Sequence, residues 1–234
     1  SWTLNDPADL ASVVAQAFAV MGSARPGPVH IEIPTDVMPL PAGEIVARAT
    51  VPARPGAAAA TLRQLAALCD DARRIVLMCG GGAVAAGAVE ALAEKLDAPV
   101  VMTVNARGLM AGHPLRVPAS PSLAATRRLI AEADLVIGLG TEMGQTDYDM
   151  YDDGRFPPLA RFVRVDIDPL QLARAPHADL PVLSTVEAAV DGLLPLVAAR
   201  SGDGAARAAA TREAAWQELT PKIRTEIGVI EAIY

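Results

Sequence analysis

A glycine-rich turn with the pattern Gly80-x-Gly82-x-x-Ala85 is the sharpest chemical signal in the sequence. It follows the apolar run Ile75 to Cys79 and precedes an alanine-rich segment with helical character. Glycines permit a tight turn after a strand, and the N-terminus of a following helix can face a phosphate. A dinucleotide site also needs an acidic residue at the end of the next strand, where this chain has Asn105. Nucleotide binding and simple tight-turn packing therefore both remain open.

Asp166 and Asp168 close another predicted strand, over residues 162–167. Ligands of open parallel sheets bind at the carboxyl edge of the strands, where these carboxylates could accept hydrogen bonds from ribose or adenine groups. Aspartate is also a favoured helix N-cap, so a capped turn before Pro169 is an equally good interpretation.

The other chemistry-bearing residues form no recognised site. Cys69 and Cys79 fit no disulfide framework and no metal or redox motif, which predicts small buried apolar residues. The dispersed histidines and the lack of a G-x-S-x-G elbow give no support to zinc or hydrolase chemistry. The acids of the loop over residues 140–154 miss the EF-hand spacing for calcium, so this loop is interpreted as a lid or an interface. Arg107 and His113 could contact an anion, although a solvated loop arginine is the commoner case.

Composition excludes several classes of partner. The chain has 234 residues, of which 52% are apolar and 3% aromatic, and this suits helices packed on a parallel sheet. Its formal net charge of −7 comes without a basic stripe, which argues against nucleic-acid binding. Since no uninterrupted run of about 18 apolar residues and no leader pattern occurs, we expect a soluble cytoplasmic protein without a membrane partner.

The spacing of apolar residues predicts the elements that must position these side chains. Continuous apolar runs predict strands over residues 75–79, 99–104, 135–139 and 162–167, with another short strand near Val182. Helical spacing predicts helices from residue 58 onward, over residues 122–133 and over residues 186–199. Helices between buried strands indicate crossover connections, so we expect an α/β fold with a doubly wound parallel sheet.

Segments on either side of this predicted sheet have a different character. Residues 1–38 contain a helix and one alternating strand, which cannot form a domain alone because the backbone groups of the strand would stay unpaired. Prolines and glycines without periodicity make residues 39–57 a linker. Residues 58–199 form the predicted sheet domain. Residues 200–234 form a polar, alanine-rich helical tail with no strand to pack on, which predicts a second linker.

A family resemblance is carried by several stretches that cover nearly the whole chain in order. Residues 25–37 (RPGPVHIEIPTDV) resemble the segment that ends the pyrimidine-binding domain of acetolactate-synthase-like, thiamine-diphosphate-dependent enzymes. Residues 74–82, 134–140 and 163–169 resemble the Rossmann-like central domain of the same family. The resemblance implies that residues 1–38 are the end of the pyrimidine-binding domain and that residues 200–234 lead towards a diphosphate-binding domain.

The resemblance also implies a central domain that helps to fix the dimer and tetramer and that in some members binds FAD or ADP. A nucleotide there would contact the carboxyl edge of the sheet. The residues that we expect at such a site are Gly80, Gly81, Gly82, Asn105, Arg107, Gly140, Thr141, Asp166 and Asp168.

In enzymes of this family, thiamine diphosphate lies between two other domains, held by an activating glutamate and by a G-D-G motif with a downstream Asn that binds magnesium and diphosphate. Glu32 comes too late to match the glutamate, and Gly202-Asp203-Gly204 is followed by no Asn, so it is expected to cap the last helix. We therefore expect this chain to bind neither thiamine diphosphate nor magnesium and to be inert alone. It would act only with the flanking pyrimidine- and diphosphate-binding domains of its own polypeptide, in a homo-oligomeric enzyme.

The loop after residue 140 differs from that of true acetolactate synthases and is similar to that of decarboxylases of long 2-oxo acids such as 5-guanidino-2-oxopentanoate. Its acids would suit a cationic substrate tail. One alternative is an autonomous FAD- or ADP-binding module. A nucleotide-dependent deacetylase is disfavoured because the paired C-x-x-C motifs of a zinc site are missing.

Overall fold

The computed structural model describes residues 1–23, 25–43, 45–46, 50–148, 156 and 158–233. These residues fall into two compact units, residues 1–55 and residues 56–234, and each is described by itself.

Strands of the larger unit pair in one parallel sheet with the order β5-β4-β3-β6-β7-β8. Their bounds are β3 Ile75–Cys79, β4 Val100–Met102, β5 Arg116–Val117, β6 Leu135–Leu139, β7 Phe162–Asp166 and β8 Leu180–Leu183. The order of the strands along the chain reverses between β3 and β6, which is the arrangement of a doubly wound sheet. The predicted α/β fold is confirmed.

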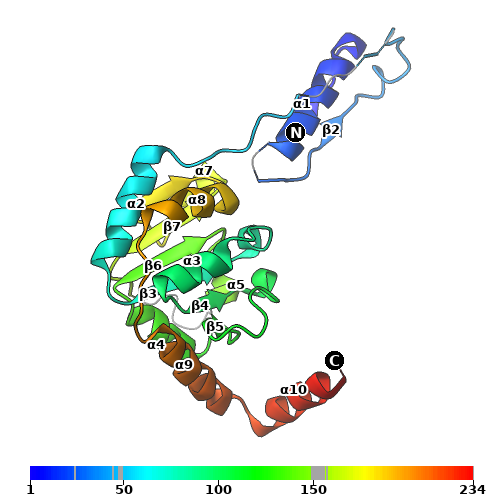
Figure 1. Ribbon diagram of the computed structural model, residues 1–234. Coiled ribbons are helices and arrows are strands. Elements are labelled where there is room, and N and C mark those ends of the chain that lie inside the picture. The colour runs from blue at the N-terminus through cyan, green and yellow to red at the C-terminus, as the bar shows by residue number, and fades with distance from the viewer. Residues whose placement is uncertain (24, 44, 47–49, 149–155, 157, 234) are drawn as a thin grey trace. The chain divides into compact units, whose positions relative to one another are not determined.

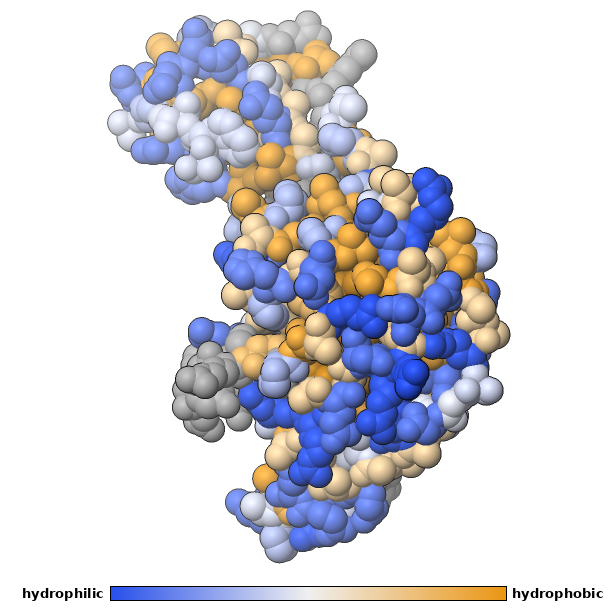
Figure 2. Space-filling model, turned by 90° about the vertical axis from the view of Figure 1, so that its left-hand side faces the viewer, coloured by the Kyte–Doolittle hydropathy of each residue, from blue (hydrophilic) through white to orange (hydrophobic). Residues whose placement is uncertain are grey.

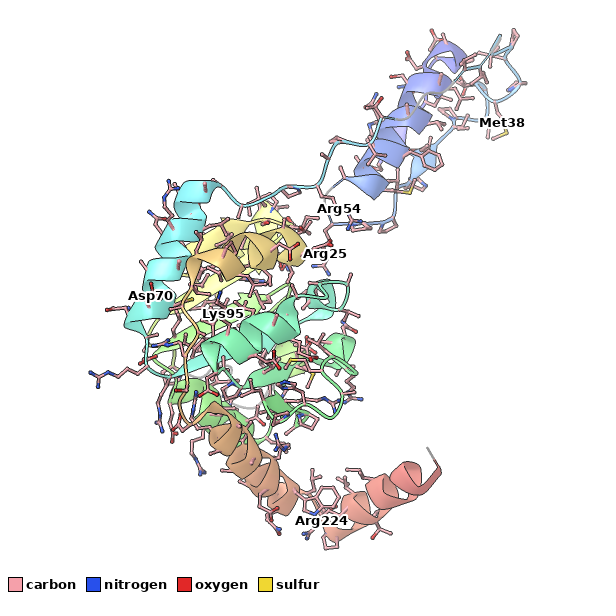
Figure 3. The ribbon with its side chains drawn as sticks, in the orientation of Figure 1. Arg25, Met38, Arg54, Asp70, Lys95 and Arg224 are labelled. Atoms are coloured by element: carbon pink, nitrogen blue, oxygen red, sulfur yellow. The ribbon has the colours of Figure 1, made fainter. Side chains whose placement is uncertain are left out.

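Helices cover both faces of this sheet, which is why its central strands are buried along their whole length (Figure 1). The helices of one apolar cluster are α2 Ala59–Asp71, α3 Val89–Leu96 and α8 Val186–Leu193. The other cluster contains α4 Ala124–Ala131 and α9 Gly204–Glu218. Lys95 of α3 (labelled in Figure 3) connects this helix to the residue that follows α8, because its Nζ donates a hydrogen bond to the Leu194 carbonyl at 2.7 Å. In the described part of the chain, no helix has the length and apolar character needed to cross a membrane.

Residues 200–234 were predicted to form a helical tail with no strand to pack on, but α9 packs on the larger unit. It contacts α4 and β5, and its Ala208 is fully buried in the second apolar cluster. The Glu218 carboxylate accepts hydrogen bonds from the first N–H groups of α4, those of Ala124 at 2.7 Å and Ala125 at 2.6 Å. These contacts make α9 part of the core of the larger unit, and α10 (Pro221–Ile233) follows it.

One edge of the sheet is the two-residue strand β5, which the sequence did not predict. The N–H of Val100 in its pairing partner β4 donates to the Leu115 carbonyl at 2.9 Å. The neighbouring carbonyls of Pro114 and Arg116 accept instead from the Arg212 guanidinium of α9, at 2.8 and 2.7 Å. A side chain from another element therefore fills the hydrogen-bonding positions of the edge strand.

The smaller unit contains β1 (Trp2–Thr3), α1 (Leu10–Gly22) and β2 (Ile31–Glu32), with β1 and β2 paired in a sheet of their own. Asp6 caps the first turn by accepting from the N–H of Ala8 at 2.8 Å. Large apolar side chains stay exposed here, among them Phe18 at 55% and Met38 at 65%. Met38 is labelled in Figure 3, and Figure 2 shows apolar surface between the polar side chains of this unit. A unit with so few strands has little surface on which to bury them.

Candidate functional site

The carboxyl edge of the sheet between β3 and β6 is where a doubly wound fold binds ligands, because the chain reverses its winding there. The structure brings two glycine turns together at this point. The N–H of Gly82 donates to the Gly140 carbonyl at 3.1 Å, and that of Gly80 donates to the Leu139 carbonyl at 3.0 Å. Backbone from the turn after β3 thus lies directly on backbone from the turn after β6.

This close approach explains why the positions are glycine. A Cβ atom on Gly80 would lie 2.3 Å from the Gly140 carbonyl oxygen, and one on Gly140 would lie 2.7 Å from the Cα of Gly82. Gly140 also has a φ of +57°, which other residues rarely adopt. The glycine pattern is therefore accounted for by packing of the chain on itself.

The segment after the glycines differs from the predicted strand–turn–helix. A short 3₁₀ helix spans Gly81–Ala83, and α3 begins only at Val89. The N–H groups of Ala83 and Val84 donate to the carbonyls of Gly80 and Gly81. Since these groups are used within the turn and no α-helix starts there, the arrangement favours tight-turn packing over a phosphate cradle.

Thr141 lies under the β6 turn, buried with Tyr148 of α5 (Gln145–Tyr148). The Thr141 hydroxyl and the Tyr148 hydroxyl are 2.9 Å apart and form a hydrogen bond. Burial raises the pKa of the Tyr148 phenol and the bond to Thr141 opposes this, so the phenol stays neutral. The Tyr148 ring also meets Phe156 edge to face, with centroids 5.0 Å apart. This part of the loop is packed core and not an exposed lid.

Arg164 is a fully buried residue of β7 that was not among the predicted site residues. Its Nη2 donates to the carbonyls of Thr141 at 3.1 Å and Glu142 at 3.0 Å, and its Nη1 to that of Arg174 at 3.5 Å. Burial lowers the pKa of this guanidinium, while the nearby Asp166 carboxylate raises it. The side chain holds the loops that follow β6 and β7. The sequence signal that could have identified Arg164 is its charge, because it stands inside an otherwise apolar buried strand.

The two strand-closing acids take part in a local turn. Asp166 is buried, and one of its carboxylate oxygens accepts from the N–H of Asp168 at 2.9 Å. Asp168 caps α7 (Pro169–Leu172), because its carboxylate accepts from the N–H of Leu170 at 2.8 Å. The capped-turn interpretation is confirmed for Asp168.

The remaining predicted site residues follow β4. Asn105 lies beside the glycine turn, since a Cβ on Gly81 would be 3.3 Å from the Asn105 Cβ. Arg107 is exposed and lines a separate hollow with Arg116 and Asp147. The structure therefore gathers Gly80–Gly82, Asn105, Gly140 and Thr141 at the reversal point and gives Arg107 different neighbours. Of the acidic loop over residues 140–154, the stretch 149–154 lies outside the described residues.

A cluster of Glu90, Glu94 and His113 is the one group of metal-ligand types within reach of one another among the described residues. The His113 Nδ1 accepts from the N–H of Leu115 at 3.2 Å, so the neutral ring carries its proton on Nε2. That Nε2 lies 3.2 Å from Glu94 Oε1 and donates to it. A metal would need the Nε2 lone pair, so the geometry indicates a hydrogen-bonded pair.

The Gly202-Asp203-Gly204 motif is not built as a magnesium loop. The two Asp203 carboxylate oxygens face arginines, Arg207 Nε at 2.8 Å and Arg74 Nη2 at 3.6 Å. Asp203 is the N-cap residue of α9 by position, but the Asp97 carboxylate accepts the N–H of Gly204 at 3.0 Å. The motif was expected to cap the last helix. It stands at the start of α9, which α10 follows, and the capping side chain is that of Asp97.

Both cysteines are buried, as the sequence predicts, and their thiols stay protonated. Burial raises the pKa of Cys79 from 9.0 to about 12, and burial with the nearby Asp70 raises that of Cys69 to about 12 against the opposing effect of Arg200. Thiolate chemistry at neutral pH is therefore disfavoured.

These thiols predict a loss of stability in alkali. Below pH 9 the thiols are protonated in both the folded and the unfolded chain, so they do not change the free energy of unfolding with pH. Above pH 9 the thiols ionise only in the unfolded chain. The free energy of unfolding should then fall by up to about 1.4 kcal/mol per pH unit for each thiol. Urea unfolding of the parent chain and Cys79→Ala between pH 9 and 10 should show a smaller slope in the variant. Equal slopes would mean that the Cys79 pKa is the same in both states.

Comparison with known proteins places this fold in a family. Residues 62–193 match the family model of the thiamine pyrophosphate enzyme central domain. The protein named "Probable 2-ketoarginine decarboxylase AruI" from Pseudomonas aeruginosa is 44% identical over 168 residues, which are 70% of this chain and 29% of that protein. The acetolactate synthase isozyme 1 large subunit of Escherichia coli is 35% identical over 199 residues, 82% of this chain and 35% of that protein.

A solved structure from Mycobacterium smegmatis, described as a thiamin diphosphate-dependent enzyme, is also similar. It has a TM-score of 0.71 and 28% identity, with 86% of this chain and 40% of that chain covered. The chain therefore spans less than half the length of these relatives. It belongs to the thiamine pyrophosphate enzymes, and residues 62–193 are the central domain of that family.

Proposed function

We propose that this chain is a structural domain of a longer thiamine-diphosphate-dependent enzyme that decarboxylates or ligates 2-oxo acids, and that it contributes no catalytic group. The observation that carries the proposal is the closed reversal point of the sheet, where backbone of Gly80–Gly82 lies on backbone of Gly140. A doubly wound fold normally offers its ligand site there. The same closure argues against an autonomous FAD- or ADP-binding module.

The described residues do not fit the diphosphate and magnesium of that cofactor. Magnesium prefers several oxygen ligands in a near-octahedral arrangement. The Asp203 carboxylate is already paired with arginines, and a Cβ on Gly204 would lie 2.1 Å from the Asp97 carbonyl oxygen, so no room remains at this motif. Thiamine diphosphate and magnesium would be held by the flanking pyrimidine- and diphosphate-binding domains of the parent, which we propose to be a homo-oligomer. The domain limits 1–38 and 39–57 are part of this proposal, and the central domain that starts at residue 58 is extended through α9 (Gly204–Glu218) because that helix packs in its core.

The relatives support a proposal for the substrate class. The decarboxylase is 44% identical to this chain, against 35% for the synthase from Escherichia coli. The loop after β6, with Glu142 and Asp147, is the segment that favours a decarboxylase of a cationic 2-oxo acid. We therefore propose 5-guanidino-2-oxopentanoate, which is 2-ketoarginine, as the substrate of the parent enzyme.

A domain exchange tests this function. Residues 62–193 of this chain would replace the matching segment of the AruI protein, and carbon dioxide release from 2-ketoarginine would be measured. If the domain is only structural, the kcat of the chimera should lie within about tenfold of that of the unchanged AruI protein. This corresponds to about 1.4 kcal/mol in the activation free energy. The matched control carries the synthase segment instead. A chimera that assembles but has lost activity would show that this domain supplies more than structure.

Calorimetry tests the absence of a cofactor site. The 234-residue chain, titrated with thiamine diphosphate in the presence of magnesium, should release no heat of binding. Saturable heat at micromolar concentrations would contradict the proposal.

A further inference from the structure

A hollow of about 160 Å³ lies beside the carboxyl ends of β4 and β5, apart from the reversal point. Arg107, Arg116 and Asp147 supply its charges, and its apolar walls are Met102, Val104, Pro118 and Pro121. Sites for drug-sized ligands measure about 300–1,000 Å³, so this one has room for a molecule of only a few heavy atoms.

Arg116 lines this hollow and also carries an unsatisfied donor. Its Nε is buried and has no hydrogen-bond partner. Within the described part of the chain, no hydrogen bond or ion pair engages the guanidinium of Arg116 or of Arg107, or the carboxylate of Asp147. A buried N–H without a partner costs free energy, and an arginine fork matches the two oxygens of a carboxylate.

Backbone contacts hold Arg116 in this position. Its carbonyl accepts from the Arg212 guanidinium at 2.7 Å, and its N–H donates to the His113 carbonyl at 3.1 Å. The backbone that carries this side chain is thus fixed.

We propose that this hollow binds a small aliphatic carboxylate, with the carboxylate on Arg116 and Arg107 and the short hydrocarbon against the apolar walls. Asp147 selects against a phosphate dianion, because it places a negative charge on the same wall. This site shares Asp147 with the loop on which the substrate proposal rests, but none of its residues belongs to the glycine turns, so carboxylate binding and the domain exchange are tested separately.

Nuclear magnetic resonance of arginine Nε–H groups tests the site directly. The 234-residue chain would be titrated with sodium propanoate, and separately with sodium chloride at equal ionic strength. The Arg116 resonance, identified by its loss in Arg116→Lys, should move and saturate with propanoate only. Movement equal to that in chloride, or stronger binding of inorganic phosphate, would overturn the proposal.

Variants separate a built site from general charge attraction. Arg107→Met removes an exposed side chain and should weaken propanoate binding by about threefold, and Arg116→Lys by about tenfold. Arg63→Met, which removes an exposed charge on α2, is the matched control and should leave binding unchanged. The rise in melting temperature with propanoate gives a second readout, which should vanish in Arg116→Lys. Equal weakening in all variants would contradict a specific site.

Discussion

Gly80→Ala is expected to lower the free energy of unfolding by about 3 kcal/mol, because the new methyl group meets backbone that cannot move aside. The Cβ would lie 2.3 Å from the Gly140 carbonyl oxygen and 2.5 Å from the Thr141 Cα. Relief requires that the turns after β3 and β6 separate, which breaks the bond between Gly82 and Gly140. Urea unfolding followed by circular dichroism measures the change.

Gly87→Ala is the matched control. A Cβ on this glycine would have no atom within 4 Å, and its φ is not positive, so the free energy of unfolding should change by less than about 0.5 kcal/mol. If both alanine variants unfold at the same urea concentration, the glycine turns are not packed as described.

Arg164→Met is expected to cost about 2–3 kcal/mol of unfolding free energy. The change leaves the carbonyls of Thr141, Glu142 and Arg174 without this donor, at about 1–3 kcal/mol for each that stays buried. Removal of a desolvated charge recovers part of the loss, because a buried ion is itself costly. Urea unfolding again measures the result.

Arg164→Lys refines this prediction. Lysine keeps the charge but cannot reproduce the planar fork, so its stability should fall between those of the parent and the methionine variant. Arg63→Met is the control for the loss of an exposed arginine and should be nearly neutral. A methionine variant as stable as the parent would show that the carbonyls find other donors.

The sheet was largely predictable because its central strands are continuous apolar runs. β3 and β6 have the predicted bounds, since a strand buried on both faces needs apolar residues throughout. β5 was missed because Arg116–Val117 has no pattern of its own and is set by β4 and by Arg212. The late start of α3 was missed because alanine propensity suggests a helix where glycines form turns.

The residues of the candidate site could be predicted from the sequence, but their role could not. Glycine spacing alone does not distinguish a phosphate cradle from two turns in contact, since both need space for backbone. The partner, Gly140, lies far along the chain and becomes visible only when β3 and β6 pair. The role of Arg164 also depends on carbonyls from distant loops. Such tertiary contacts leave no local signature.

The hydrogen bonds from Arg212 to β5 have a consequence for how copies of this chain meet each other. Unpaired carbonyls along the last strand of a sheet are a template on which a strand of another molecule can add. The Arg212 guanidinium occupies two of these carbonyls, those of Pro114 and Arg116, and so blocks that addition. A chain shortened to end before α9 would present this template openly and would tend to polymerise through β5.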